Sequence, residues 1–102
     1  MKHYRIVWHP KARVDLLALY GWIAEQADPD TAFEYTSKIE RYTAKLANFP
    51  DRGTPRDDLV PHMRTIPYRR RTLIAYRVVD EGVEILAIVH GGRDFGRVFE
   101  EE

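Results

Sequence analysis

The residues best suited to chemistry lie at the end of the last predicted strand, in the segment ILAIVHGGRDF (85–95). His90 can exchange a proton near neutral pH, and the guanidinium of Arg93 can neutralise a phosphate. With a tyrosine nearby, either Tyr68 or Tyr76, this pair could cleave RNA without a metal. The same segment could equally be a strand end held by backbone contacts, because the two glycines allow backbone angles that other residues avoid.

We therefore interpret the segment as a structural element where the chain leaves the sheet. It also shapes an edge that binds a target, and it contains no catalytic residue. The candidates for contact with a target are His90, Arg93, Asp94 and Phe95. Other chemistry has little support. The four histidines show no helical i, i+4 pair and there is no cysteine, so no metal site is predicted. No phosphate-binding glycine loop or nucleophile elbow occurs, and no cofactor is predicted.

A second group of candidates comes from a cluster of arginines. Five arginines and no acid lie between Leu59 and Val79, whereas the net charge of the whole chain is zero. Attraction of the whole molecule to nucleic acid is therefore not expected, and no direct sequence-specific binding of nucleic acid is predicted. The cluster favours one acidic partner segment, although a solvated sheet edge would have the same composition. The candidates for contact with this partner are Arg69, Arg70, Arg71, Tyr76 and Arg77.

Length and composition limit the architecture that can position these groups. The chain of 102 residues, 44% hydrophobic and 31% charged, is expected to form one domain over residues 1–102. Its longest apolar run, 85–89, is far shorter than the roughly 20 residues of a membrane span. With no signal peptide and no cysteine, a cytoplasmic location without membrane attachment is expected.

The N-terminal half is predicted to be a strand followed by a helical hairpin. Residues 3–9 alternate in the manner of a strand, and Pro10 suits the first turn of a helix. This helix has an apolar stripe at helical spacing, made by Val14, Leu17, Tyr20 or Gly21, and Ala24 and widened by Leu16, Leu19 and Ile23. The second helix is capped by Asp28, begins at Pro29 and runs to Phe49, where Pro50 stops it. Almost nothing separates the helices, so an antiparallel pair is expected, followed by a polar loop over 51–58.

The C-terminal half is predicted to be a three-stranded antiparallel meander. Its strands are 62–66, closed by Pro67, then 71–79 and 83–90. A three-residue loop with Gly82 in the left-handed conformation would put Val79 opposite Val83. Alternation then assigns the apolar residues to two faces. Leu73, Ala75, Val79, Val83, Ile85, Ala87 and Val89 share one face, and Ile74, Tyr76, Val78, Leu86 and Ile88 share the other.

These elements predict an α+β fold: an N-terminal strand, an antiparallel helical hairpin and the meander, joined in one small sheet. Two helices can cover only one face of such a sheet. Because both faces are mostly apolar, either the sheet curls on itself or an apolar strip stays open. An open strip on a monomer usually marks a partner site.

This order of elements resembles the ParE/RelE superfamily of bacterial type II toxins. The pieces that carry the resemblance are WHPKARVDLLALYGWIA (8–24), FPDRGTPR (49–56), PHMRTIPYRRRTLIAYRV (61–78) and VEILAIVHGGRDF (83–95). Together they cover nearly the whole chain. The segment FPDRGTPR before the meander and the segment HGGRD after its last strand resemble the ParE branch more than the RelE branch. The turn with Tyr68 and three arginines, where relatives often have a glycine, and Ala75, where many have an aromatic residue, depart from the pattern.

The resemblance implies a toxin that binds and inhibits DNA gyrase and is neutralised by a small DNA-binding antitoxin with an amphipathic tail, in a hetero-oligomeric complex. The arginines named above and Tyr76 then become candidates for contact with the antitoxin. The alternative is a RelE-type endonuclease that cleaves mRNA on the ribosome. The zero net charge and the three glutamates at the end of the sequence disfavour this nuclease, which would have to bind the phosphates of RNA. We therefore expect the gyrase-directed, non-enzymatic activity.

Overall fold

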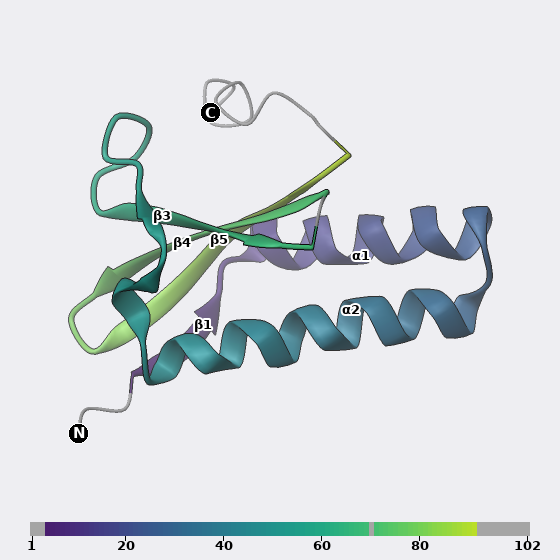
Figure 1. The fold of residues 1–102 in the computed structure, drawn as a ribbon, viewed down its shortest axis with the longest axis horizontal. Helices are drawn as coiled ribbons and strands as arrows, with labels where there is room; N and C mark the ends of the chain where they lie inside the picture. The colour runs from purple at the N-terminus through teal and green to yellow at the C-terminus, as the bar shows by residue number, and fades with distance from the viewer. Residues whose placement is uncertain (1–3, 70, 92–102) are drawn as a thin grey trace.

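The computed structural model describes residues 4–69 and 71–91. In chain order the elements are β1 (Arg5–Trp8), α1 (Pro10–Gln26), α2 (Pro29–Ala44), the 3-10 turns η1 (Lys45–Ala47) and η2 (Pro50–Arg52), β2 (Thr54–Pro55), β3 (Met63–Tyr68), β4 (Thr72–Val79) and β5 (Gly82–His90). Figure 1 shows α1 and α2 side by side and antiparallel, beside one twisted sheet. The predicted α+β fold with a helical hairpin is confirmed.

The sheet has five strands in the order β1-β5-β4-β3-β2. β1 pairs in parallel with β5, and the other neighbours are antiparallel. The predicted meander is β3, β4 and β5. The fifth strand, β2, was not expected. Thr54 and Pro55 lie inside the segment 51–58 that was interpreted as a polar loop, and they pair with Thr65 and Arg64 of β3. Two residues are too few to produce an alternating pattern, so sequence periodicity could not reveal it.

Capping residues fix where both helices begin. His9 accepts a hydrogen bond at Nδ1 from the backbone N–H of Lys11 (3.2 Å), and Asp28 accepts one at Oδ1 from the N–H of Thr31 (2.7 Å). The predicted start of the second helix is confirmed, but its predicted end at Phe49 is wrong. The α-helix ends at Ala44 and tightens into the 3-10 turn Lys45–Ala47, and Phe49, directly before Pro50, has left the helical region with φ −135° and ψ 67°.

The predicted apolar stripe of α1 is partly wrong. Val14 and Leu17 are 64% and 73% exposed, whereas Ala12, Leu19 and Ile23 are buried. Apolar residues occur on almost every side of this helix, so their spacing alone does not determine which side meets the sheet. One consequence is that α1 carries large apolar side chains into solvent.

The β4–β5 hairpin departs from the predicted register in two ways. Its loop has two residues, with Asp80 at φ 58°, and Val79 pairs with Gly82, which is not left-handed. The register then shifts between Ala75, which pairs with Ala87, and Tyr76, which pairs with Ile85. The extra residue in β5 is a β-bulge, which reverses the side on which the following side chains lie.

The bulge changes the predicted faces of the sheet. Val83 and Ile85 join the core beneath the helices, with Ile74, Tyr76 and Ile88, instead of sharing a face with Ala87. Leu86 packs with Met63, Ala75, Ala87 and Val89 on the second face. Alternation over the whole strand assigned these residues wrongly because a bulge leaves no mark in the hydrophobic pattern.

Pro67 was expected to close the predicted strand 62–66, but it lies within β3 and pairs with Leu73. β2 pairs only with Arg64 and Thr65, so β3 has no further strand beside it at Pro67 among the described residues. A proline is tolerated there because an edge position needs no outward N–H. The carbonyl of Pro67 accepts a hydrogen bond from the hydroxyl of Tyr42 on α2 (3.1 Å).

The predicted open strip does not run across the centre of the second face, where Met63, Ala75, Ala87 and Val89 are all buried. Only Val7 and Val79, at 47% and 45%, are exposed large apolar residues of described strands. The other exposed large apolar side chains lie off the sheet: Val14, Leu17, Trp22, Phe33 and Phe49. Within the described part of the chain, no helix is long and apolar enough to cross a membrane.

Candidate partner-binding surface

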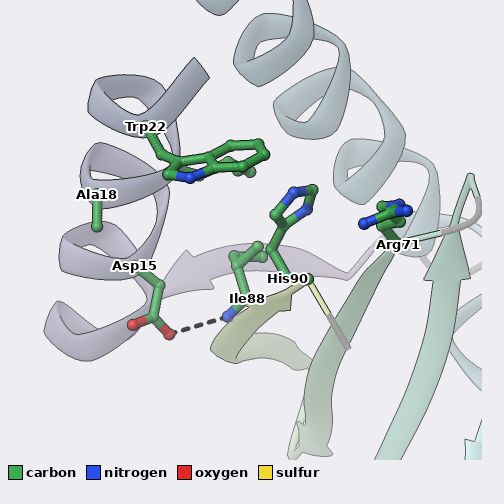
Figure 2. Close-up of a pocket in the computed structure, with 8 residues that line it drawn as sticks. Asp15, Ala18, Trp22, Arg71, Ile88 and His90 are labelled. Atoms are coloured by element: carbon green, nitrogen blue, oxygen red, sulfur yellow. Dashed lines mark hydrogen bonds between the residues drawn. The ribbon is translucent and has the colours of Figure 1, made fainter. Parts of the chain in front are cut away.

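A groove of about 360 Å³ opens between α1 and the end of β5 (Figure 2). It is lined from α1 by Asp15, Ala18, Leu19 and Trp22, from the start of β4 by Arg71, and from the end of β5 by Ile88, His90 and Gly91. The floor is apolar, one wall is aromatic, and the rim carries a guanidinium.

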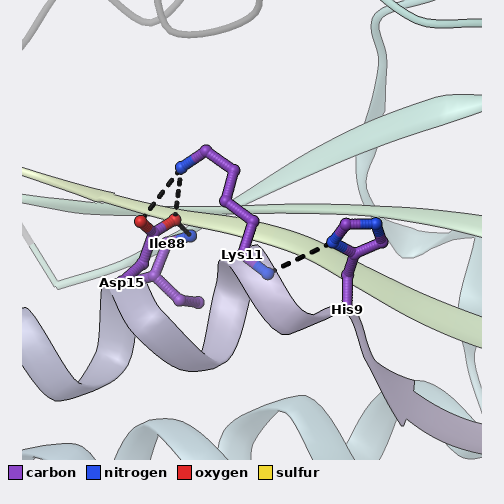
Figure 3. A network of polar contacts seen from close by, with 4 residues as sticks. All are labelled: His9, Lys11, Asp15 and Ile88. Carbon is purple, nitrogen blue, oxygen red and sulfur yellow. Dashed lines mark hydrogen bonds and ion pairs between the residues drawn. The ribbon is translucent and has the colours of Figure 1, made fainter. Parts of the chain in front are cut away.

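Asp15 fixes the distance between α1 and β5. β1 accompanies β5 only as far as Trp8, which pairs with Ile85, so β5 has no strand on this edge beyond that point in the described chain. There the carboxylate of Asp15 accepts a hydrogen bond from the N–H of Ile88 (3.0 Å), and it also binds Nζ of Lys11 at 2.9 Å (Figure 3). The helix thus supplies the acceptor that a neighbouring strand would otherwise provide.

His90 is held by a chain of hydrogen bonds. Its Nδ1 lies 2.9 Å from Oγ1 of Thr72, which lies 2.9 Å from the hydroxyl of Tyr35 on α2. Its ring also contacts Trp22, with 5.2 Å between ring centroids. Burial, and secondarily the nearby Arg71, lower the pKa of His90, so the imidazole is neutral at neutral pH. Nε2 of His90 is buried without a hydrogen-bond partner in the described structure.

The end of β5 is shaped by its first glycine. Gly91 has φ 81°, and its N–H donates to the carbonyl of Arg71 (3.0 Å). The expected use of left-handed backbone is therefore confirmed at this position. Three of the four predicted target contacts, Arg93, Asp94 and Phe95, lie outside the described residues, as does Arg70 of the arginine run.

The structure separates the predicted antitoxin contacts. Arg69, at φ 58°, places its guanidinium 5.5 Å from the ring centroid of Tyr68. Arg71 follows at the start of β4 and lines the groove. Arg77 instead donates from Nε to Oε1 of Glu84 at 2.7 Å, a pair that spans β4 and β5. Arg69 and Arg71 are thus near the groove end of the sheet, and Arg77 is not.

Tyr76, predicted to contact the antitoxin, is a core residue with no exposed surface. Its hydroxyl donates to the carbonyl of Pro50 (2.8 Å) and accepts from the N–H of Gly53 (2.9 Å). Burial raises the pKa of this phenol. The prediction is corrected because Tyr76 lies on the face of β4 that packs in the core with Ile74, and an aromatic residue in a strand does not reveal which face the helices cover.

Asp15 and Trp22 line the groove and Thr72 bonds His90 beside it, but none of the three was among the sequence candidates. A signal was present for the first two. Asp15, Ala18, Leu19 and Trp22 follow one another at steps of three, one and three, which is the spacing of a single helix face. Thr72 had no such signal, because a threonine in a strand is ordinary. Among the described residues, no group of three or more histidine, cysteine or acidic side chains could hold a metal ion.

The comparisons with known proteins identify this arrangement. Residues 6–95 match the family described as the ParE toxin of the type II toxin–antitoxin system, parDE. The chain belongs to the ParE toxin family. A solved chain titled "Chromosomal ParDE TA system from P. aeruginosa" is similar to this ParE toxin at 26% sequence identity, with a TM-score of 0.75. The match covers 86% of this chain and 96% of that chain. No curated protein is matched by sequence.

The family assignment confirms the resemblance read from the sequence. It makes this ParE toxin one component of a type II toxin–antitoxin system, whose partner is an antitoxin. The groove between α1 and β5 is formed wholly within the matched residues.

Proposed function

We propose that this ParE toxin inhibits DNA gyrase by binding it, without catalysis, and that it acts in the cytoplasm until a cognate antitoxin sequesters it. The target contacts are expected at the end of β5, from His90 through Phe95, and the antitoxin contacts at Arg69, Arg70 and Arg71. The family match supports the toxin role. Non-enzymatic binding is supported by the state of the groups that a nuclease would need.

The observation that carries the proposal is the environment of His90. A general base must reach the proton that it removes and must be free to accept it. The Nδ1 of His90 already bonds Thr72, and its Nε2 is buried. Of the two tyrosines that could have completed a nuclease set, Tyr68 is 9% exposed and Tyr76 is fully buried. These side chains are placed as structural groups, which suits a shaped binding edge better than acid–base chemistry.

Two assays on the purified toxin test the proposal. In the first assay, the toxin should inhibit supercoiling of DNA by gyrase or trap the complex of gyrase with cleaved DNA. In the second assay, ribosome-bound mRNA should remain intact. His90→Ala should lower gyrase inhibition by less than about tenfold, whereas loss of a general base costs about a hundredfold or more. His62→Asn is the matched control, because His62 is exposed and asparagine tolerates its φ of 66°.

Removal of residues 91–102 should reduce gyrase inhibition strongly, because the predicted target contacts extend through Phe95. Circular dichroism should verify that the shortened protein remains folded. Ribosome-dependent cleavage of mRNA that His90→Ala abolishes, with gyrase unaffected, would instead establish the RelE-type activity.

A further inference from the structure

The groove between α1 and β5 contains an unused cation. Arg71 is exposed and forms no ion pair among the described residues. By contrast, Arg77 is paired with Glu84 across the sheet. Arg71 is also close enough to His90 to lower its pKa. A guanidinium at the rim of a groove is suited to a planar anion, which it can bind through two parallel hydrogen bonds.

The remainder of the groove is suited to apolar atoms. Leu19 and Ile88 are buried in its floor, and Trp22 is 51% exposed in its wall. An aromatic ring of this size left half in solvent can bury substantial area against a partner. Figure 2 shows Trp22 and Arg71 on opposite sides of His90, and all three line the same groove.

The charge of the groove limits the anion that fits. Asp15 also lines it, and its carboxylate is already bonded to Lys11 and to the N–H of Ile88. One free cation beside a carboxylate favours a single negative charge over the closely spaced charges of nucleic acid.

We propose that this groove receives a carboxylate side chain from an apolar segment of the antitoxin, which pairs with Arg71 while neighbouring apolar atoms cover Trp22. The inference rests on the proposed neutralisation by an antitoxin and adds a specific contact to it. The position is a recognition site and has no catalytic role.

Occupancy should be linked to protonation of His90. The groups around this ring are Arg71 from the turn before β4, Thr72 from β4, Trp22 from α1 and Tyr35 from α2, and Asp15 of α1 lines the same groove. An anion beside Arg71 offsets the positive charge that disfavours imidazolium, and so it raises the pKa of His90. Binding then takes up a proton, and affinity should rise as the pH falls below about 6.5, the ordinary pKa of histidine.

The groove can be tested on the free toxin with 3-phenylpropanoate, which joins an apolar ring to one carboxylate. NMR should show saturable shifts of the Trp22 indole and the His90 ring, and much weaker shifts with the uncharged 3-phenylpropanamide. Arg71→Gln should weaken binding of the acid by about fivefold or more. Arg41→Gln, an exposed arginine of α2, is the matched control and should have no effect. Equal binding of the acid and the amide, or no shift at either residue, would overturn the proposal.

The complex provides the second test. Each acidic residue in the tail of the co-expressed antitoxin is neutralised in turn, and affinity is measured in wild-type and Arg71→Gln backgrounds. One carboxylate should show a coupling of about fivefold or more with Arg71. If the antitoxin binds tightly but no position couples, the groove contact is wrong and the proposed neutralisation stands. If no antitoxin binds the toxin, both fail.

Discussion

Removal of one buried hydroxyl should reveal how the loop before the meander is held. In Tyr76→Phe, the ring stays in the core but the carbonyl of Pro50 loses its donor and the N–H of Gly53 loses its acceptor. Both bonds are buried. A Cβ built on Gly53 would lie 2.6 Å from the Tyr76 hydroxyl oxygen, so the two residues are in close contact.

The expected cost follows from the two groups left unpaired. A buried donor or acceptor without a partner costs about 1–3 kcal/mol. Two such groups, relieved in part by local adjustment, should lower the free energy of unfolding by roughly 2–4 kcal/mol. Tyr42→Phe is the matched control. Its hydroxyl bonds the Pro67 carbonyl at an exposed site, where water can replace it, so its cost should stay below about 0.5 kcal/mol.

Urea denaturation followed by circular dichroism measures both variants under the same conditions. A difference between them of less than about 1 kcal/mol would refute the reasoning, because it would mean that water reaches Pro50 and Gly53 when the hydroxyl is gone. The same Tyr76→Phe protein should bind the antitoxin with unchanged affinity, since a residue with no exposed surface contributes no direct contact.

Two further predictions concern the groove. Because the pKa of His90 is lowered in the folded state, the unfolded chain binds the proton more readily, and the folded protein should lose stability as the pH falls below about 6.5. Denaturation at pH 5 to 7.5 should show that the free energy of unfolding changes less with pH in His90→Gln than in the wild type, and equal pH dependence would contradict this. Asp15→Ala should destabilise the protein by about 1–2 kcal/mol and accelerate hydrogen exchange at the Ile88 amide, which loses its acceptor; Glu34→Ala, which removes an exposed ion pair on α2, should do neither.

The sequence was informative where a single residue type has a strong local effect. Asp28 and Pro29 placed the start of α2, because a side-chain cap and a fixed φ act within one turn. The branched and aromatic runs of β4 and β5 were equally clear. The order of elements then carried the fold class, since few architectures join a strand, a helical hairpin and a meander.

The errors have a common physical origin in contacts that are distant along the chain. The side of β5 that faces the helices depends on the bulge in β5 between Ile85 and Ala87, and β2 exists only because β3 lies beside it. The groove depends on Asp15 reaching Ile88, a contact between the first helix and the last described strand. The candidate residues His90 and Arg71 were found because their chemistry is visible in isolation, whereas Trp22 needed the helix face to be placed first.

The parallel pairing of β1 with β5 has a consequence for how this toxin is made. β1 is synthesised first, and the partner strand of its ladder is the last described strand to leave the ribosome. Until Gly82–His90 has emerged, the parallel ladder of β1 and the Ile88 anchor of α1 are both missing. A nascent chain therefore carries the apolar residues of β1 and α1 without their sheet, and such exposed segments are targets for chaperones and proteases. The groove also needs Ile88 and His90, so the proposed antitoxin contact at Arg71 can form only after translation has passed β5.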